Sequence, residues 1–126
     1  IGTSLQKAGF TDVRVYNNGQ EAWEYISSLK DDPDLYKKIN LVITDIEMPM
    51  MDGHRLTKLM KEDMRLKRIP VVIFSSLINE QMRVKGKEVG ADEQLSKPEI
   101  GHLVEILDIL IKRFRESDHA VLAHGA

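Results

Sequence analysis

The sequence predicts an α/β fold, with a parallel sheet covered by helices on both faces. Two short runs of branched or aromatic apolar residues, at 41–43 and 71–74, have the composition of strands that are buried on both sides. A helix is predicted after each run: an amphipathic pattern starts at His54, and a polar helix starts after the predicted cap Asn79. Strands that alternate with helices at this spacing need crossover connections, and those connections produce a parallel sheet.

Composition limits the class of protein. The chain has 126 residues, 42% of them hydrophobic and 30% charged, with a net charge of −2, as expected for one globular domain without a bias toward polyanions such as nucleic acids. It contains no cysteine, which excludes disulfides, thiolate metal sites and cysteine nucleophiles. No apolar run is long enough to span a membrane and no signal-peptide pattern opens the chain, so we expect a cytoplasmic protein.

Each element is predicted from apolar spacing and from capping residues. Asn18 and Asn79 are predicted helix N-caps, and Gly9 and Gly90 are predicted helix ends. The predicted elements are the last turns of a helix at 1–8, a strand at 13–16, a helix at 18–29, a strand at 41–44, a helix of about ten residues from 54, a strand at 71–74, a helix at 79–89, a strand within 91–96 and a helix at 99–115. The domain is assigned to residues 1–116, and 117–126 is expected to be a frayed C-terminal tail.

Three polar residues each lie at the carboxyl end of a predicted strand: Asp45, Ser75 and Lys97. In a parallel sheet these ends meet at one edge, where such folds place their ligands. Each residue alone is more simply explained as a turn residue or a solvated charge. Together they form a set suited to phosphoryl transfer, with the carboxylate as nucleophile and the hydroxyl and ammonium as partners for phosphoryl oxygens. A divalent ion, Mg²⁺, would neutralise charge between Asp45 and the incoming phosphate.

The same residues carry a family resemblance. The chain resembles the receiver domain of bacterial two-component response regulators in its segments 44–53, 69–76, 90–92 and 97–98, which occur in the order and spacing typical of that family. The resemblance implies a flavodoxin-like, doubly wound sheet of order 2-1-3-4-5. It also implies that Asp45 accepts the phosphoryl group, that the backbone carbonyl of Glu47 is a metal ligand, that Ser75 and Lys97 bind the phosphoryl group, and that the Lys97–Pro98 peptide is cis.

Several segments are similar to one class of receiver. Segments 45–49, 54–58, 74–78 and 94–100 resemble the C-terminal receiver of chemotaxis coupling proteins of the CheV type. That resemblance implies a histidine kinase of the CheA kind as the phosphodonor. It also implies a link to the chemoreceptor array through a CheW-like domain, and no such domain is present in this sequence.

Two departures from the receiver pattern matter. Receivers carry an acidic pair at the end of their first strand, and that pair completes the Mg²⁺ site. This sequence starts after that point, so the first strand is missing and we expect the pair to lie upstream of Ile1. The second departure is Gln94, which stands where receivers often have an aromatic switch residue, so the part of the switch that depends on a ring is absent.

Two other functions compete with a phosphoaccepting signalling domain. A haloacid-dehalogenase-type phosphohydrolase also uses a strand-end aspartate with a second acid two residues later, the position of Glu47, but it needs a further acidic motif after the lysine that we do not find. A degenerate receiver acting as a plain interaction module is the other alternative: the missing acidic pair and Gln94 argue for it, and the presence of Asp45, Ser75 and Lys97 together argues against it. The separation of His54 and His102 gives no metal-site spacing, and both are predicted to face solvent.

Overall fold

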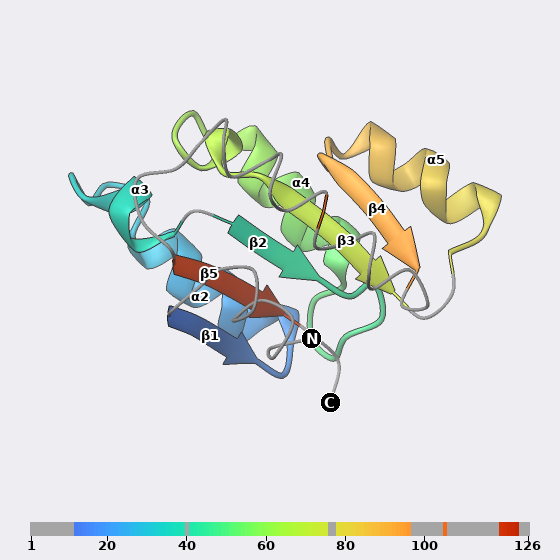
Figure 1. Ribbon diagram of the computed structural model, residues 1–126, viewed down its shortest axis with the longest axis horizontal. Coiled ribbons are helices and arrows are strands. Elements are labelled where there is room, and N and C mark those ends of the chain that lie inside the picture. The colour runs from blue at the N-terminus through green and yellow to red at the C-terminus, as the bar shows by residue number, and fades with distance from the viewer. Residues whose placement is uncertain (1–11, 40, 76–77, 97–104, 106–118, 124–126) are drawn as a thin grey trace.

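The computed structural model describes residues 12–39, 41–75, 78–96, 105 and 119–123 (Figure 1). These residues form strands and helices that alternate along most of the chain. In chain order they are β1 (Asp12–Tyr16), α2 (Gly19–Ser28), α3 (Leu35–Lys38), β2 (Leu41–Thr44), α4 (Gly53–Glu62), the 3₁₀ turn η1 (Leu66–Arg68), β3 (Val71–Ser75), α5 (Glu80–Glu88), β4 (Glu93–Ser96) and β5 (His119–Ala123).

The strands form one parallel sheet with the spatial order β1-β5-β2-β3-β4. In Figure 1 all the arrows point the same way, so the carboxyl ends of the strands share one edge. The α/β class with a parallel sheet is therefore confirmed. In this order β5 lies between β1 and β2, at the central position that the expected order 2-1-3-4-5 gives to the first strand.

This last point corrects the expectation of a frayed tail at 117–126. Residues 119–123 pair with β1 on one side and with β2 on the other, with Val121 opposite both Arg14 and Val42. The side chain of Val121 is buried and belongs to the main apolar cluster. The C-terminal segment thus supplies a strand that separates β1 from β2.

The core lies between the sheet and the helices α2 and α4, which cover the same face (Figure 1). Its members are buried apolar side chains at helical spacing on those helices and at alternate positions on the strands. They include Ala22, Ile26, Val42, Leu56, Met60, Val71 and Val121. Trp23 and Tyr25 pack half-buried at the edge of this cluster.

The capping predictions at Asn18, Asn79 and Gly90 are confirmed, and Gly9 lies outside the described residues. The side chains of Asn18 and Asn79 accept hydrogen bonds from the backbone N–H groups three residues later, both at 2.8 Å, and so start α2 and α5. The chain leaves α5 through Gly90, whose φ of 93° suits glycine. The short helix α3 and the turn η1 were not predicted, because each is too short to show a periodic pattern.

The prediction for His54 is wrong. Its side chain is only 4% exposed, and it lies on α4 next to Gly53, which is also buried. Other predictions fall outside the described residues: the helices at 1–8 and 99–115 and the Lys97–Pro98 peptide. None of the helices that the structure describes is both long enough and apolar enough to cross a membrane.

Candidate functional site

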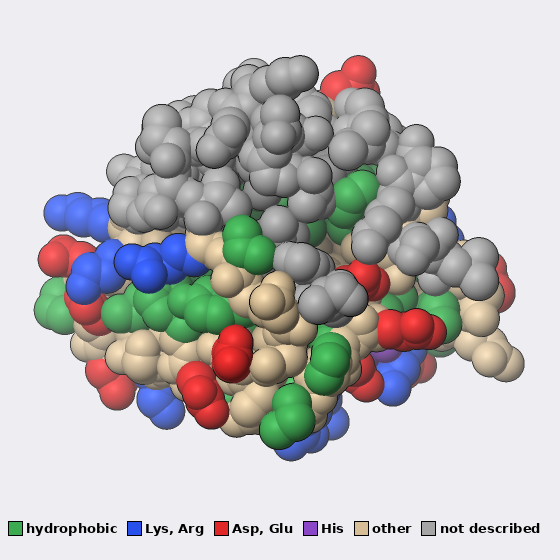
Figure 2. Space-filling model, turned by 90° about the horizontal axis from the view of Figure 1, so that it is seen from below, with side chains coloured by type: hydrophobic (Ala, Val, Ile, Leu, Met, Phe, Trp, Pro, Cys, Tyr) green, Lys and Arg blue, Asp and Glu red, His purple; other side chains and the backbone are tan. Residues whose placement is uncertain are grey.

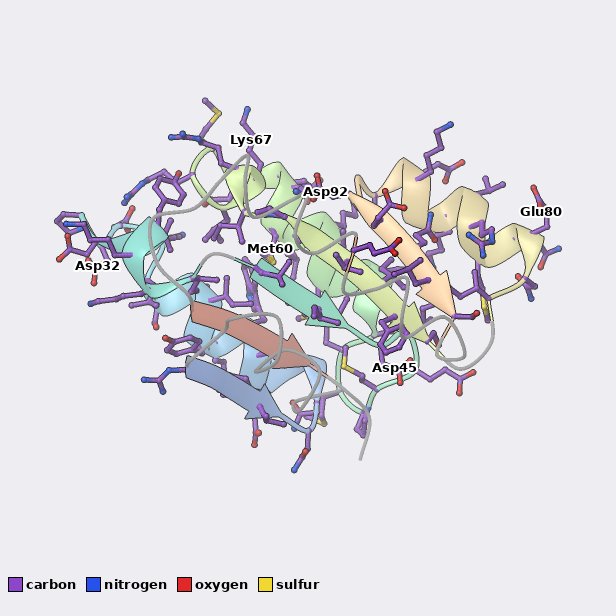
Figure 3. The ribbon with its side chains drawn as sticks, viewed as in Figure 1. Asp32, Asp45, Met60, Lys67, Glu80 and Asp92 are labelled. Atoms are coloured by element: carbon purple, nitrogen blue, oxygen red, sulfur yellow. The ribbon has the colours of Figure 1, made fainter. Side chains whose placement is uncertain are left out.

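Asp45 and Ser75 meet at the carboxyl edge of the sheet, as predicted. Asp45 directly follows β2, and Ser75 is the last residue of the neighbouring strand β3. The Ser75 hydroxyl donates a hydrogen bond of 2.8 Å to Oδ1 of Asp45. Figure 3 shows Asp45 at the arrowhead edge of the sheet, and Asp92 and Lys67 at the opposite edge.

The Asp45 carboxylate is held in a fixed orientation. Its Oδ1 atom also accepts a hydrogen bond of 2.7 Å from the backbone N–H of Ile46. Asp45 is 8% exposed and Ser75 is 5% exposed, so both polar groups are largely removed from water. A buried carboxylate is tolerated where donors satisfy it, and two donors on one oxygen fix the plane of the group.

The loop after Asp45 is tied to the start of α4. The N–H of Gly53 donates to the carbonyl of Ile46 at 2.9 Å, and the hydroxyl of Thr44 donates to the carbonyl of Asp45 at 2.9 Å. A Cβ atom on Gly53 would lie 1.9 Å from the carbonyl oxygen of Asp45, far inside any permitted contact. Thr44 and Gly53 therefore position the aspartate, a role that sequence reasoning missed although both residues lie within the motif that it singled out.

The tip of this loop carries a strained residue. Met50 has a φ of 72° and is 81% exposed. A left-handed conformation is costly for a residue with a Cβ, and nonglycine residues that adopt it often lie at functional loops. Beside it, the Met51 carbonyl oxygen lies 2.0 Å from the position of a Cβ on Gly19, so the loop packs closely on the start of α2.

The third predicted site residue, Lys97, lies outside the described residues. The preceding residue, Ser96, ends β4 and is the register partner of Ser75. The structure therefore brings together Asp45 and Ser75 from the predicted set and leaves Lys97 as a prediction.

The described residues do not make a complete site for a divalent ion by themselves. Glu47 follows Asp45 by two residues on the exposed loop, and its backbone carbonyl is the ligand that the receiver resemblance implies. Among the residues that the structure describes, no group of three or more His, Asp or Glu side chains could hold a metal ion. Asp45 supplies a carboxylate, and Mg²⁺ takes further oxygen ligands beside it.

Gln94, at the position of the aromatic switch, faces α5. Its Nε2 donates a hydrogen bond of 3.0 Å to the carbonyl of Arg83, and its Oε1 is buried without a partner in the described part of the chain. Gly86 leaves the space for this side chain, because a Cβ there would lie 2.2 Å from Gln94 Oε1. A half-buried amide thus packs against the helix at the position where receivers often have an aromatic ring.

Residues 1–114 match the response regulator receiver domain family. The chain belongs to this family. It is 36% identical over 110 residues to a gliding motility regulatory protein of Myxococcus xanthus, covering 87% of this chain and 13% of that protein. It is 32% identical over 93 residues to chemotaxis protein CheV2 of Helicobacter pylori, covering 74% of this chain and 28% of that protein. Across five curated relatives of this kind, the chain spans between 13% and 52% of the relative's length.

Solved structures agree with this fold. The signal receiver domain of a histidine kinase from Syntrophus aciditrophicus superposes with a TM-score of 0.74 at 27% identity, covering 90% of this chain and 80% of that one. The receiver domain of sensor kinase PA1611 from Pseudomonas aeruginosa, with a magnesium ion in its active-site cleft, superposes with a TM-score of 0.70 at 20% identity, covering 88% and 84%.

Membership in the receiver family fixes the general class of function. Receiver domains are phosphoacceptors that act in signalling with histidine kinases, and they are not turnover enzymes in the usual sense. The phosphohydrolase alternative is therefore set aside. Relatives of similar identity include both chemotaxis proteins and other regulators, so the family match alone does not single out chemotaxis.

Proposed function

We propose that Asp45 is the phosphoacceptor of this receiver and that Ser75 positions it. The observation that carries the proposal is the hydrogen bond of 2.8 Å between the Ser75 hydroxyl and Oδ1 of Asp45, made by two residues from neighbouring strands. It joins the predicted nucleophile to a hydroxyl partner at the edge where parallel sheets place their chemistry.

The chemistry follows from the carboxylate. A carboxylate oxygen of Asp45 attacks the phosphorus of a phosphohistidine, the O–P bond forms and the N–P bond breaks, and the imidazole of the donor leaves with a proton from solvent. The orientation imposed by the Ile46 N–H and by Ser75 reduces the freedom that must be lost on reaching the transition state. In the product the Ser75 hydroxyl donates to a phosphoryl oxygen, and Lys97 is proposed to pair with another.

The test is phosphorylation of the chain by a small acyl phosphate, followed by intact mass measurement. We expect addition of one phosphoryl group, none in Asp45→Asn, and a slower reaction in Ser75→Ala. Phosphorylation that persists unchanged in Asp45→Asn would contradict the proposal. The reaction is run with and without Mg²⁺, because the resemblance implies this cofactor whereas the described residues contain no group of three acidic or histidine side chains that could hold it.

We further propose a chemotaxis setting in the cytoplasm, with a CheA-like histidine kinase as donor. Identities of 32% and 33% to the CheV2 and CheV3 proteins of Helicobacter pylori support this, as do the segments around Asp45 and Ser75 that resemble CheV-type receivers. In such a setting a CheW-like domain would connect the receiver to chemoreceptors. Phosphotransfer profiling tests the donor: we expect a CheA-type kinase to phosphorylate the chain faster than kinases of other classes, and equal or slower transfer would refute the assignment.

We propose that phosphorylation changes a protein-binding surface next to Ser75, with Gln94 in place of an aromatic switch. The Gln94 amide donates a hydrogen bond to the Arg83 carbonyl of α5. A movement of α5 away from β4 on phosphorylation would break this hydrogen bond. Partner binding is compared between the untreated and the beryllofluoride-treated chain. A change in affinity supports a working switch, and identical affinity would favour the plain interaction module.

A further inference from the structure

A cavity lies between α4 and α5, away from the phosphoacceptor. It has a volume of about 230 Å³ and is lined by Asp52, His54, Arg55, Lys58, Lys85 and Val89. Neither Asp45 nor Ser75 lines it. A wider cavity of about 510 Å³ shares Lys58, Lys85 and Val89 with it and continues along the two helices.

The charges in the smaller cavity are unbalanced. Arg55 and Lys58 come from α4 and Lys85 comes from α5, and all three are exposed. Within the described part of the chain none of the three forms an ion pair, since the ion pairs found there involve other lysines. The one carboxylate in the lining, Asp52, accepts a hydrogen bond of 2.8 Å from the N–H of Arg55 as the N-cap of α4.

The buried wall of the cavity carries an incomplete polar group. His54 is buried, and its Nε2 has no hydrogen-bond partner among the residues that the structure describes. A buried polar atom without a partner destabilises the fold. The residue His54 lines the cavity, whereas its Nε2 atom is itself buried below the cavity surface.

We propose that this cavity is a binding site for a small, multiply charged oxyanion, of the sulfate or phosphate class. Three cations from two helices converge on it, and an anion offers them oxygen acceptors. Protonated His54 adds a positive charge behind the cavity wall. Since the cavity lies across the gap between α4 and α5, a bound oxyanion links the two helices.

The groups around His54 determine how binding depends on pH. Burial, followed by the charge of Lys85, lowers the pKa of His54 below its usual 6.5, and Asp52 and the Met82 carbonyl act in the opposite direction. Arg55 and Lys58 face the same cavity. A bound dianion favours the imidazolium, so we expect sulfate, whose own charge is constant between about pH 5 and 8, to bind more tightly as the pH falls.

The test is sulfate titration of the full chain by NMR, at constant ionic strength maintained with chloride. We expect saturable shifts at His54 and along α4 and α5, and about fivefold or greater weakening in Lys58→Gln and in Lys85→Gln, corresponding to the loss of one charged hydrogen bond. Lys67→Gln is the matched control, since Lys67 lies at the far edge of the sheet (Figure 3). His54→Gln should retain binding and lose the dependence on pH.

Two outcomes would overturn the proposal. Chemical shifts that do not saturate would show only a non-specific effect of charge. The same conclusion would follow if Lys67→Gln weakened sulfate binding as much as Lys58→Gln and Lys85→Gln do. Shifts confined to Asp45 and Ser75 would place sulfate at the phosphoacceptor instead. Asp45→Asn should leave binding between α4 and α5 intact, and the two lysine variants should still be phosphorylated, so failure of this site and failure of the proposed function are distinguishable.

Discussion

A glycine-to-alanine pair tests how tightly the phosphoacceptor is held. In Gly53→Ala the new Cβ would lie 1.9 Å from the carbonyl oxygen and 2.9 Å from the carbonyl carbon of Asp45, both rigid backbone atoms. The start of α4 must therefore move by more than about 1 Å, which strains the hydrogen bond from Gly53 N–H to the Ile46 carbonyl. We expect a loss of about 3 kcal/mol in the free energy of unfolding, from overpacking and a weakened hydrogen bond.

Gly86→Ala is the matched control. Its Cβ would also be crowded, at 2.2 Å, but the neighbour is the end of the flexible Gln94 side chain. Loss of the Gln94–Arg83 hydrogen bond costs about 1 kcal/mol and the gain in helix propensity returns about the same amount, so stability should barely change.

Thermal and urea unfolding measure the stability of both variants, and labelling with an acyl phosphate measures the rate at which Asp45 is phosphorylated. A loss of about 3 kcal/mol corresponds to roughly 10 °C in the melting temperature of a domain of this size. Gly53→Ala should also phosphorylate more slowly at a temperature where it is folded, because Asp45 moves with the strained loop. If Gly53→Ala were as stable as Gly86→Ala and were labelled at an unchanged rate, the close approach of Gly53 to the Asp45 carbonyl would be refuted.

Three further predictions concern other parts of the molecule. Met50→Gly should raise the free energy of unfolding by about 1 kcal/mol in urea denaturation, because φ is 72° at this exposed position; a loss would contradict the strain. Because the pKa of His54 is lowered in the folded state by burial and by Lys85, the unfolded chain binds more protons, so stability should fall as the pH drops through 6.5 and the decrease should be smaller in His54→Gln. Asp92→Asn should cost about 1–2 kcal/mol by thermal unfolding, since Asp92 Oδ2 accepts from Lys61 Nζ at 2.8 Å and from Val71 N–H at 2.7 Å; an unchanged melting temperature would exclude a structural role.

Burial patterns explain which elements the sequence could predict. The strands before Asp45 and Ser75 are largely apolar, and every residue of β2 and β3 is buried, so their composition alone identifies them. The juxtaposition of Asp45 and Ser75 then follows from the topology of parallel sheets. Asn18 and Asn79 are equally predictable, because capping is a local interaction.

The remainder depends on contacts that a local pattern does not contain. Residues 119–123 are too few to distinguish a strand from a loose end, and their strand conformation depends on pairing with both β1 and β2. His54 is predicted to face solvent because it is polar, yet it is buried on α4 beside a cavity lined from α5. Figure 2 illustrates the same limit at the surface: on the described part of this face, acidic and basic side chains are interspersed, so no broad charged patch marks a site.

The most direct measurement of the central claim is chemical mapping of the phosphorylated residue. After reaction with an acyl phosphate, borohydride reduction converts an aspartyl phosphate to homoserine, which tandem mass spectrometry locates in the sequence. We predict homoserine at position 45. Its yield should be lower in Ser75→Ala, because that variant lacks the hydrogen bond of 2.8 Å to the Asp45 carboxylate. Homoserine at another aspartate, or none in a folded chain that carries a phosphoryl group, would contradict the assignment of Asp45 as the phosphoacceptor.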